Sequence, residues 1–500
     1  MALGIDLGTC NTVAASTGRD GVPVLIPDCN LRENLTTPSI LHLDNRSALV
    51  GVNAENYMEL YPEKNFIRYY KRNFGTQNPV LFDEKGNAWF SEAIAALMLK
   101  KIKFDAEMFL HDLGGGLVIT VPAHYNDAQR KSVIEAAKLA DLSLDAIVEE
   151  PVAAAINYIS KISRGEEIVM VYDFGGGTFD LTIMTRSGNE MYVLAKDGIS
   201  NLGGKEFDEV IAQKIMEDYG QCFGENLPMD MANANKIRKL SEAIKLSIFS
   251  EKNAQTGRWI TFGKRAFEFN MDHQEFADKS AGLILMTEKV VERCLRSVGL
   301  SFSDIAKMIL VGGTSKIPFI KEYWAKKINP AKQELIFHDP MNSVALGASV
   351  YAAGFAGNSN GKMELKTVAT YNLALKGVAP TEEQVEVLIQ KNTPLPFAAT
   401  KTVKLNPRAK VSYELLQFWD INQDKTVLGN IHIGPFESAS PIHITISLEN
   451  RANGTIGLKV KNAENGKDMR FDFVKTKSEY TYNFEEQKKL VDNILINNIV

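Results

Sequence analysis

VYDFGGGTFD, from Val171 to Asp180, carries the clearest indication of the fold in this chain. It predicts an apolar strand, a glycine-rich hairpin and a second strand that restarts at Thr178. The glycines at 175–177 remove side chains where a backbone must approach something closely, and consecutive N–H groups in such a turn can cradle phosphate oxygens. Asp173 stands just before the turn, where a hydrated metal ion on those phosphates needs a carboxylate. An ordinary hairpin with a flexible tip is the alternative for this motif alone.

GIDLGTCNT, from Gly4 to Thr12, repeats the same plan. A strand leads to Asp6, and a polar turn with Gly8 and Thr9 follows. Two such hairpins about 170 residues apart indicate a duplicated domain with two facing lobes and a nucleotide between them. No GxxxxGK[ST] loop occurs, and no GxGxxG opens a helix after a strand, so the pattern is neither a P-loop nor a Rossmann fingerprint.

The composition is that of an ordinary globular protein of 500 residues, long enough for about two to four domains. A net charge of −5 without a long basic run argues against nucleic acid as the main partner. Four scattered cysteines indicate a reducing compartment and no disulfide framework. No apolar run reaches the roughly 18 residues of a membrane span, and the first strand starts too early for a signal peptide. We therefore expect a cytoplasmic protein that binds no membrane.

Helix signals lie between the two hairpins. Residues 91–110 begin with a serine N-cap and continue with apolar residues at helical spacing, and Asn126 caps a second helix over 127–140. Residues 114–121 predict a buried strand, and Pro151 stands at the first position of a third helix. On its own, Lys71 is most simply interpreted as a surface lysine.

Seven motifs follow one another in the order and spacing of the 70-kilodalton heat-shock chaperones, and the chain resembles this family, in particular its bacterial DnaK type. The motifs are GIDLGTCNT (4–12), VITVPAHYNDAQR (118–130), EEPVAAA (149–155), VYDFGGGTFDLTI (171–183), LGGKEFD (202–208), ILVGGTSKIP (309–318) and SVALGA (343–348). The resemblance is strong over residues 2–355 and weak over 365–475. It implies an α/β actin-like two-lobed ATPase domain (1–357), a linker (358–368) and an all-β sandwich that binds peptides (369–476).

The resemblance also implies roles for individual residues. Lys71 resembles the lysine that orients the attacking water, and Glu150 the glutamate that positions and polarises it; Asp173 and Thr178 complete the expected catalytic set. Asp6 and Asp173 resemble the carboxylates that hold hydrated Mg²⁺. The residues implied to bind ATP or ADP are Gly8, Thr9, Cys10, Asn11, Gly175, Gly176, Gly177, Thr178, Gly203, Glu242, Lys245, Gly312, Gly313, Ser315 and Lys316. Pro122 and Arg130 resemble a switch pair that relays nucleotide state to the second domain.

Several positions depart from the family pattern around the base. Leu246 and Phe249 replace polar residues, Lys316 replaces an arginine that packs against adenine, and Met341 replaces an acidic residue. Lysine lacks the planar face with which arginine stacks, so we expect ATP to bind with reduced affinity. Glu242 and Lys245 stand at i and i+3 on one helix, which also fits a plain surface ion pair. Cys10 replaces a threonine, and a redox-sensing role is a minor alternative that requires a lowered pKa and exposure.

Charges interrupt the linker. Glu364 and Lys366 stand in a segment that is apolar in the family, which predicts weakened docking on the ATPase domain. The family's partners include J-domain co-chaperones and nucleotide-exchange factors. Ala146 and Glu149 replace polar or basic positions near the J-domain site, which argues against that coupling.

Residues 369–476 show short alternating runs separated by turns, as expected for a β-sandwich. By resemblance this module grips extended apolar peptides, and we expect Val411 and Tyr413 to form part of the pocket wall. Plain sandwich core is the alternative for both residues. Residues 477–500 predict one short amphipathic helix in place of the family's helical lid, free to fold back over the peptide cleft or to dock on another chain.

These observations favour an ATP-dependent chaperone with slow ATPase activity, Mg²⁺ as its cation and unfolded or extended polypeptides as clients, with roles in protein folding and the stress response. A nucleotide-switched scaffold for one dedicated partner is the alternative. Sugar kinases and filament-forming actin relatives share the phosphate hairpins, but the C-terminal sandwich and EEPVAAA (149–155) argue against both.

Overall fold

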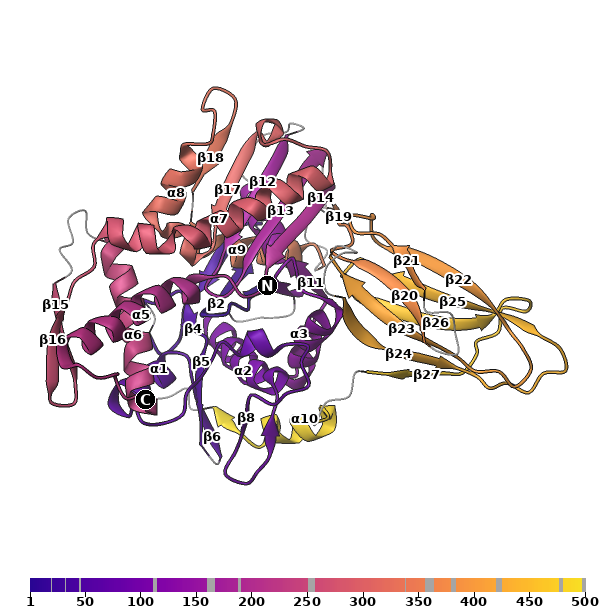
Figure 1. Ribbon diagram of the computed structural model, residues 1–500, viewed down its shortest axis with the longest axis horizontal. Coiled ribbons are helices and arrows are strands. Elements are labelled where there is room, and N and C mark those ends of the chain that lie inside the picture. Colours follow the sequence, from indigo (N-terminus) through magenta and orange to yellow (C-terminus); the bar gives the residue numbers. More distant parts are fainter. Residues whose placement is uncertain are drawn as a thin grey trace.

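The computed structural model describes residues 1–18, 20–31, 33–44, 46–110, 115–159, 167–187, 190–250, 257–337, 339–355, 364–378, 384–419, 425–475 and 480–496. It has a two-lobed α/β unit and a β-sandwich that projects from one side of it (Figure 1). The predicted fold class is therefore confirmed. None of the described helices combines the length and apolarity needed to cross a membrane.

Lobe I is built on a sheet whose main strand order is β11-β10-β1-β2-β3, with β4 paired to β2. The strands are β1 (Ala2–Asp6), β2 (Asn11–Thr17), β3 (Pro23–Ile26), β4 (Thr37–Pro38), β10 (Leu117–Val121) and β11 (Ala146–Glu149). β1 is antiparallel to β2 and parallel to β10. Of the predicted strand 114–121, Gly115 and Gly116 are not in a strand, and Gly114 lies outside the described residues.

Lobe II repeats this arrangement in the order β18-β17-β12-β13-β14-β19. The strands are β12 (Ile168–Phe174), β13 (Phe179–Ser187), β14 (Glu190–Ile199), β17 (Lys307–Val311), β18 (Glu334–Ile336) and β19 (Glu364–Lys366). β12 is antiparallel to β13 and parallel to β17, as β1 is to β2 and β10. The two hairpins recognised in the sequence thus occupy equivalent places in two equivalent sheets.

Two helices, α4 (Glu150–Ile159) and α9 (Ser343–Ala353), pack against each other between the two sheets. Both are rich in alanine, and they approach so closely that a Cβ on Gly347 would lie 1.7 Å from the carbonyl oxygen of Ala153. Only glycine fits at that crossing. This close packing fixes the start of α4, and with it Glu150, at the junction of the lobes.

The remaining elements surround the two sheets. Lobe I adds α1 (Val52–Leu60), α2 (Ser91–Phe109), α3 (Asp127–Leu139), the 3-10 turn η1 (Tyr70–Asn73) and the strands β5 (Ile40–Leu43), β6 (Ser47–Val50), β7 (Ile67–Arg68), β8 (Leu81–Phe82) and β9 (Ala88–Trp89). Lobe II adds α5 (Gly204–Phe223), α6 (Met231–Ser250), α7 (His273–Ser297), α8 (Pro318–Ala325), two 3-10 turns (Phe302–Asp304 and Gly313–Lys316) and the hairpin β15 (Arg258–Phe262) with β16 (Arg265–Phe269). The expected helices at 91–110 and 127–140 are found to within one residue, and Asn126 forms a capping box with Gln129. The predicted serine N-cap of the first helix is wrong, because Ser91 is the first helical residue and Phe90 stands at the N-cap without a side-chain hydrogen bond.

The sandwich consists of the sheets β21-β20-β23-β24-β27 and β22-β25-β26. Its strands are β20 (Asn372–Val378), β21 (Val385–Ile389), β22 (Phe397–Leu405), β23 (Val411–Phe418), β24 (Thr426–Ile433), β25 (Ile442–Asn450), β26 (Ile456–Asn462) and β27 (Phe471–Val474). Alternate residues of the two sheets meet in one apolar core, as the alternating sequence pattern requires.

The linker is docked along its described part, and the strength of that docking stays a prediction. Residues 364–366 form β19, which pairs in parallel with β14, and the ammonium of Lys366 lies 2.7 Å from a carboxylate oxygen of Glu190. The charge of Lys366 therefore pairs with lobe II. Residues 358–363 of the expected linker lie outside the described residues.

The C-terminal segment forms the predicted helix, α10 (Phe484–Asp492), and then a short strand, β28 (Leu495–Ile496). Over its described residues it does not fold back over the sandwich. Instead α10 packs on α2 and α3 of lobe I, and β28 pairs in parallel with β6 (Figure 1).

Candidate functional site

A cavity of about 450 Å³ lies between the two lobes. Both glycine hairpins, the start of α4, one face of α6 and the loop after β17 contribute to its walls. The predicted site residues that line it are Asp6, Gly8, Thr9, Cys10, Asn11, Lys71, Glu150, Asp173, Gly175, Gly176, Thr178, Glu242, Lys245, Gly312, Gly313 and Lys316. Residues from position 6 to position 316 of the chain are thus brought to one place.

The two hairpins face each other so closely that side chains on the second would collide with the first. A Cβ on Gly176 would lie 2.3 Å from the sulfur of Cys10, and one on Gly177 would lie 2.5 Å from Cγ2 of Thr9. The glycines are therefore required by the approach of the hairpins to each other as well as by any ligand. Burial raises the pKa of Cys10 to about 11, which leaves the thiol protonated near neutral pH and argues against the redox-sensing alternative.

Three carboxylates and one lysine form the polar floor of the cavity. The Lys71 ammonium lies 3.2 Å from a carboxylate oxygen of Glu150 and donates a hydrogen bond to the carbonyl oxygen of Leu7, and Thr120 donates to Asp6 at 3.0 Å. Lys71 is only 2% exposed, so the interpretation of a surface lysine is wrong.

The buried carboxylates of this floor carry more negative charge than Lys71 alone can neutralise. Burial raises the pKa of Asp6 to about 6 and that of Glu150 to about 8, in each case against the attraction of Lys71. Burial, with repulsion from Glu150, raises the pKa of Asp173 well above its ordinary value. One lysine does not neutralise three buried carboxylates, so the oxygen-rich donor set fits a hydrated divalent cation such as Mg²⁺.

Asp180 is a member of this group that we did not single out from the sequence. It lies opposite Asp173 across the β12–β13 hairpin, is 1% exposed, and raises the pKa values of both Glu150 and Asp173. Its carboxylate accepts a hydrogen bond from the backbone N–H of His124 at 3.0 Å and lies 2.7 Å from Nδ1 of that residue. The signal was present, because DFGGGTFD places an aspartate symmetrically on each side of the turn.

The opposite end of the cavity is less polar. Leu246, Ile317, Pro340 and Met341 line it beside Lys316. The side chain of Phe249, the other predicted departure, lies outside the described residues. This end is therefore suited to a flat apolar group, such as a nucleobase.

Glu242 and Lys245 also line the cavity but do not pair with each other. Glu242 lies 3.2 Å from Arg68 of lobe I, whereas Lys245 lies 2.7 Å from Asp208 and donates to the carbonyl oxygen of Gly204 at 3.2 Å. The simple i, i+3 ion pair is therefore not found. Arg68 and Glu242 instead join the two lobes across the cavity.

Three predicted binding residues, Gly177, Gly203 and Ser315, do not line the cavity. The backbones of Gly177 and Gly203 are in contact, and a Cβ on Gly203 would lie only 2.5 Å from the nitrogen of Gly177. Ser315 is buried, and its hydroxyl donates to the carbonyl oxygen of Val311 at 2.6 Å. These residues shape the loops. Arg72, which the sequence had not marked as a site residue, donates to the carbonyl oxygen of Gly177 at 2.9 Å and pairs with Glu206.

Arg130 links the site region to the sandwich. Its guanidinium lies 2.8 Å from a carboxylate oxygen of Glu149, donates to the carbonyl oxygen of Ala123 at 3.1 Å just after Pro122, and donates to the carbonyl oxygen of Asn453 at 3.2 Å. Glu149 also pairs with Lys196. Lys196 in turn donates to Thr367 at 3.2 Å, just beyond β19, so one buried network joins lobe I, lobe II and the linker end.

The two predicted peptide-pocket residues have different surroundings. Tyr413 is 4% exposed and belongs to the sandwich core, and its ring lies 5.8 Å from the ammonium of Lys401. Val411 is half-buried at the start of β23. The burial of Tyr413 fits the sandwich-core alternative.

The fold and the site together define a two-lobed, actin-like nucleotide-binding protein that carries a β-sandwich at its C-terminal side. The family model described as "Hsp70 protein" matches residues 2–494, and the chain belongs to the Hsp70 family.

Curated relatives agree with this assignment. The chain is 30% identical to the "Chaperone protein DnaK" of Thermotoga petrophila and to that of Thermotoga maritima, in each case over 100% of this chain and 86% of the relative. It is also 30% identical to the "Chaperone protein DnaK" of Thermosipho melanesiensis, over 93% of this chain and 79% of the relative. Members of this family are ATP-dependent chaperones.

Proposed function

We propose that this protein hydrolyses ATP with Mg²⁺ in the interlobe cavity and uses the nucleotide state to regulate how its sandwich binds extended apolar peptides. The observation that carries the proposal is the cluster of Asp6, Glu150 and Asp173 around Lys71, set between two hairpins. Phosphoryl transfer depends mainly on positioning and on charge neutralisation, and this cluster supplies both.

Each residue has a proposed part in the reaction. Backbone N–H groups of the two hairpins hold the phosphates, with Gly8, Thr9, Cys10 and Asn11 on one side and Gly175, Gly176 and Thr178 on the other. Asp6 and Asp173 would hold Mg²⁺ through its water ligands, and the cation would neutralise charge on the phosphates. Lys71 places a positive charge beside the transferred group, and Glu150 orients the attacking water.

Arg130 is proposed to carry the nucleotide state to the sandwich. It contacts the loop that follows β10, the carboxylate of Glu149 next to Glu150, and the sandwich turn at Asn453. A shift of Glu150 on hydrolysis would move the adjacent Glu149. Because Arg130 contacts both Glu149 and the sandwich turn, that movement would reach the sandwich. Unfolded polypeptide clients would in turn alter the rate of hydrolysis. Under the same proposal a J-domain partner and a nucleotide-exchange factor would act on this cycle.

The experiment is a measurement of ATP turnover by the full chain with Mg²⁺, with and without an unfolded apolar peptide. We expect slow hydrolysis, on the order of 1 per second or below, that the peptide stimulates. EDTA provides the control, because hydrolysis that persists without divalent cation does not come from this site. The absence of Mg²⁺-dependent turnover would refute the enzymatic part of the proposal.

A nucleotide-switched scaffold for one dedicated partner is the second candidate. It is favoured by the burial of Tyr413 at a position expected to wall a peptide pocket. Nucleotide binding without peptide-stimulated turnover, together with one stoichiometric partner in place of many unfolded clients, would favour this candidate over a general chaperone.

A further inference from the structure

The C-terminal clasp, which we define as α10 with β28 (Phe484–Ile496), is built into lobe I. Gln487 is only 2% exposed, accepts a hydrogen bond from the backbone N–H of Phe90 at 3.1 Å, and donates one to the carbonyl oxygen of Ala88 at 2.8 Å. Asn483 caps the helix by accepting from the N–H groups of residues 485 and 486. A buried side-chain amide satisfied at both ends indicates a specific, persistent contact.

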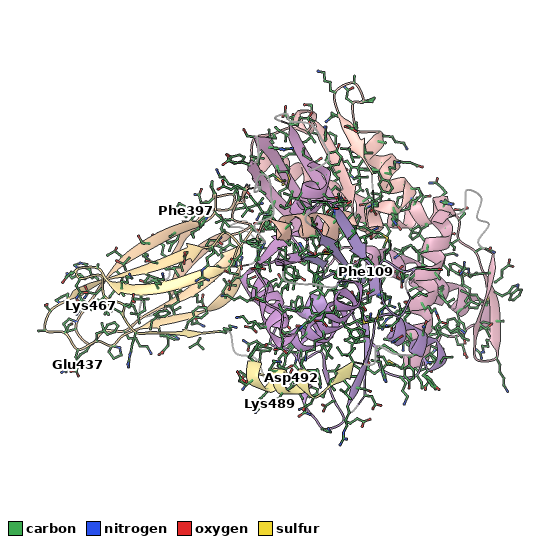
Figure 2. The ribbon with its side chains drawn as sticks, turned by 180° about the vertical axis from the view of Figure 1, so that it is seen from behind. Phe109, Phe397, Glu437, Lys467, Lys489 and Asp492 are labelled. Carbon is green, nitrogen blue, oxygen red and sulfur yellow. The ribbon has the colours of Figure 1, made fainter. Side chains whose placement is uncertain are left out.

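Apolar and strand contacts extend the same interface. Val491 is fully buried in the lobe I core, and the partly buried residues that pack there with it are Phe484, Leu490, Ile494 and Ile496. β28 continues the sheet β28-β6-β5-β7, and the N–H of Leu495 donates to the carbonyl oxygen of Arg46 at 3.0 Å. Asp492 lies 3.0 Å from the ammonium of Lys100 on α2, whereas Lys489 is exposed (Figure 2). The clasp thus folds as part of the nucleotide-binding unit.

The sandwich lies between the clasp and the linker along the chain, and both connections are short. Only residues 475–483 join β27 to α10, a reach of about 35 Å when fully extended. On the other side β19 is paired to lobe II, and the buried Thr370 donates to the carbonyl oxygen of Ala123 at 3.3 Å, immediately before β20. The sandwich is therefore attached to the nucleotide-binding unit at both ends.

The base of the sandwich makes polar contacts with α3 between these two attachments. The N–H of Ile456 donates to Asp127 at 2.7 Å, and Arg130 donates to the carbonyl oxygen of Asn453. Contacts of this kind are individually weak. With a short second attachment, a sandwich that has separated from α3 meets it again within the same molecule. The effective concentration of one surface near the other is in the millimolar range for short flexible connections. Glu437 and Lys467 lie at the far end of the sandwich, away from this interface (Figure 2).

We propose that the C-terminal clasp is an intramolecular anchor that keeps the sandwich docked on the nucleotide-binding unit both without nucleotide and with Mg-ATP. The nucleotide state then acts on the sandwich through its contacts with α3, and the sandwich is not released from the nucleotide-binding unit. This inference goes beyond the proposed function, and it holds or fails whether or not the protein hydrolyses ATP.

The test is to cut the connection in the folded full chain. A protease recognition sequence is inserted between Lys475 and Tyr480, and hydrogen exchange at the Ile456 amide is measured before and after cleavage, with and without Mg-ATP. Before cleavage we expect exchange rates that differ by less than about threefold between the two nucleotide conditions. After cleavage we expect exchange at Ile456 to be at least about tenfold faster, because docking loses its second attachment.

The Phe90 amide, which donates to Gln487, is the internal control. It is expected to stay protected after cleavage, because the clasp is held by its own contacts. Three results would overturn the proposal: an Ile456 rate unchanged by cleavage, a large loss of Ile456 protection on adding Mg-ATP to the uncut chain, or loss of protection at Phe90 on cleavage.

A matched pair of variants makes the same test without an inserted site. Gln487→Ala removes both hydrogen bonds to lobe I, whereas Lys489→Ala changes an exposed residue of the same helix. We expect faster exchange at both Phe90 and Ile456 in Gln487→Ala and at neither in Lys489→Ala. Faster exchange at Phe90 with an unchanged rate at Ile456 would show that the clasp does not hold the sandwich.

Discussion

The interlobe cavity and the sandwich were both interpreted from short sequence patterns, but the patterns proved unequal in what they determine. Most residues assigned to the nucleotide site line a single cavity, although they are scattered over three hundred positions. In the sandwich, Tyr413 points into the apolar core, and Val411 is half-buried. The geometry of a glycine hairpin can be predicted from its sequence because it depends on the backbone conformations that glycine allows. Alternation along a strand predicts only which residues share a face, and both a ligand and other side chains can cover that face.

The largest effect is expected at the cavity floor. Lys71→Ala removes the only ammonium that contacts Glu150 within the described residues. We expect single-turnover hydrolysis of Mg-ATP to fall by about 100- to 1,000-fold, which is typical for the loss of one preorganised charged or hydrogen-bonding group. Lys85→Ala, an exposed lysine in the turn between β8 and β9, is the matched control and is expected to keep the full rate. A change of less than about threefold in Lys71→Ala would remove this lysine from the reaction.

The second prediction separates core from pocket in the sandwich. Tyr413→Ala removes a ring that is 4% exposed, so the free energy of unfolding is expected to fall by about 3 kcal/mol or more. Val411→Ala, at a half-buried site, is expected to cost about 1 kcal/mol. Urea unfolding and peptide binding are measured on both. A stable Tyr413→Ala protein with altered peptide affinity would instead assign this ring to the client pocket.

The sequence predicted backbone-determined features well and side-chain partnerships less well. The duplicated sheets follow from two copies of one hairpin motif, and the cap at Asn126 follows from local chemistry. The serine cap is wrong, because Phe90 stands at the N-cap of α2 without a side-chain hydrogen bond. The ion pairs of Glu242 and Lys245 with Arg68 and Asp208 could not be derived, because these partners come from distant elements. The same holds for the docked C-terminal helix, whose amphipathic pattern predicts a buried face but not the surface that buries it.

A third prediction concerns pH and uses the shifted carboxylate of Glu150. Burial raises the pKa of Glu150 from its ordinary value of 4.5 to about 8, against the attraction of Lys71. Between these values the folded protein holds a proton that the unfolded chain has released. The free energy of unfolding therefore falls as pH rises through this window, by at most about 1.4 kcal/mol per pH unit for one group.

The measurement is urea unfolding between pH 6 and pH 8 in EDTA without nucleotide. Glu150→Gln keeps the size of the side chain and removes the proton exchange, so its stability is expected to depend less steeply on pH than that of the wild-type protein. Equal slopes in the two proteins would show that the Glu150 carboxyl does not titrate in this window. Lower stability of the wild-type protein at pH 6 than at pH 8 would give the opposite sign and contradict the assignment directly.

The smallest effect is expected at the apolar end of the cavity, where it tests whether that end holds a base. Lys316 lines the cavity beside Met341, and its ammonium offers no planar face. Lys316→Arg introduces a guanidinium that can stack, which at an exposed site contributes about 0.5–1 kcal/mol. We expect ATP to bind about two- to fivefold more tightly and inorganic triphosphate to bind with unchanged affinity, because only ATP has a base to stack on. Lys326→Arg, on the exposed end of α8, is the control. An equal gain for both ligands would mean that the new arginine acts on the phosphates and that the base lies elsewhere.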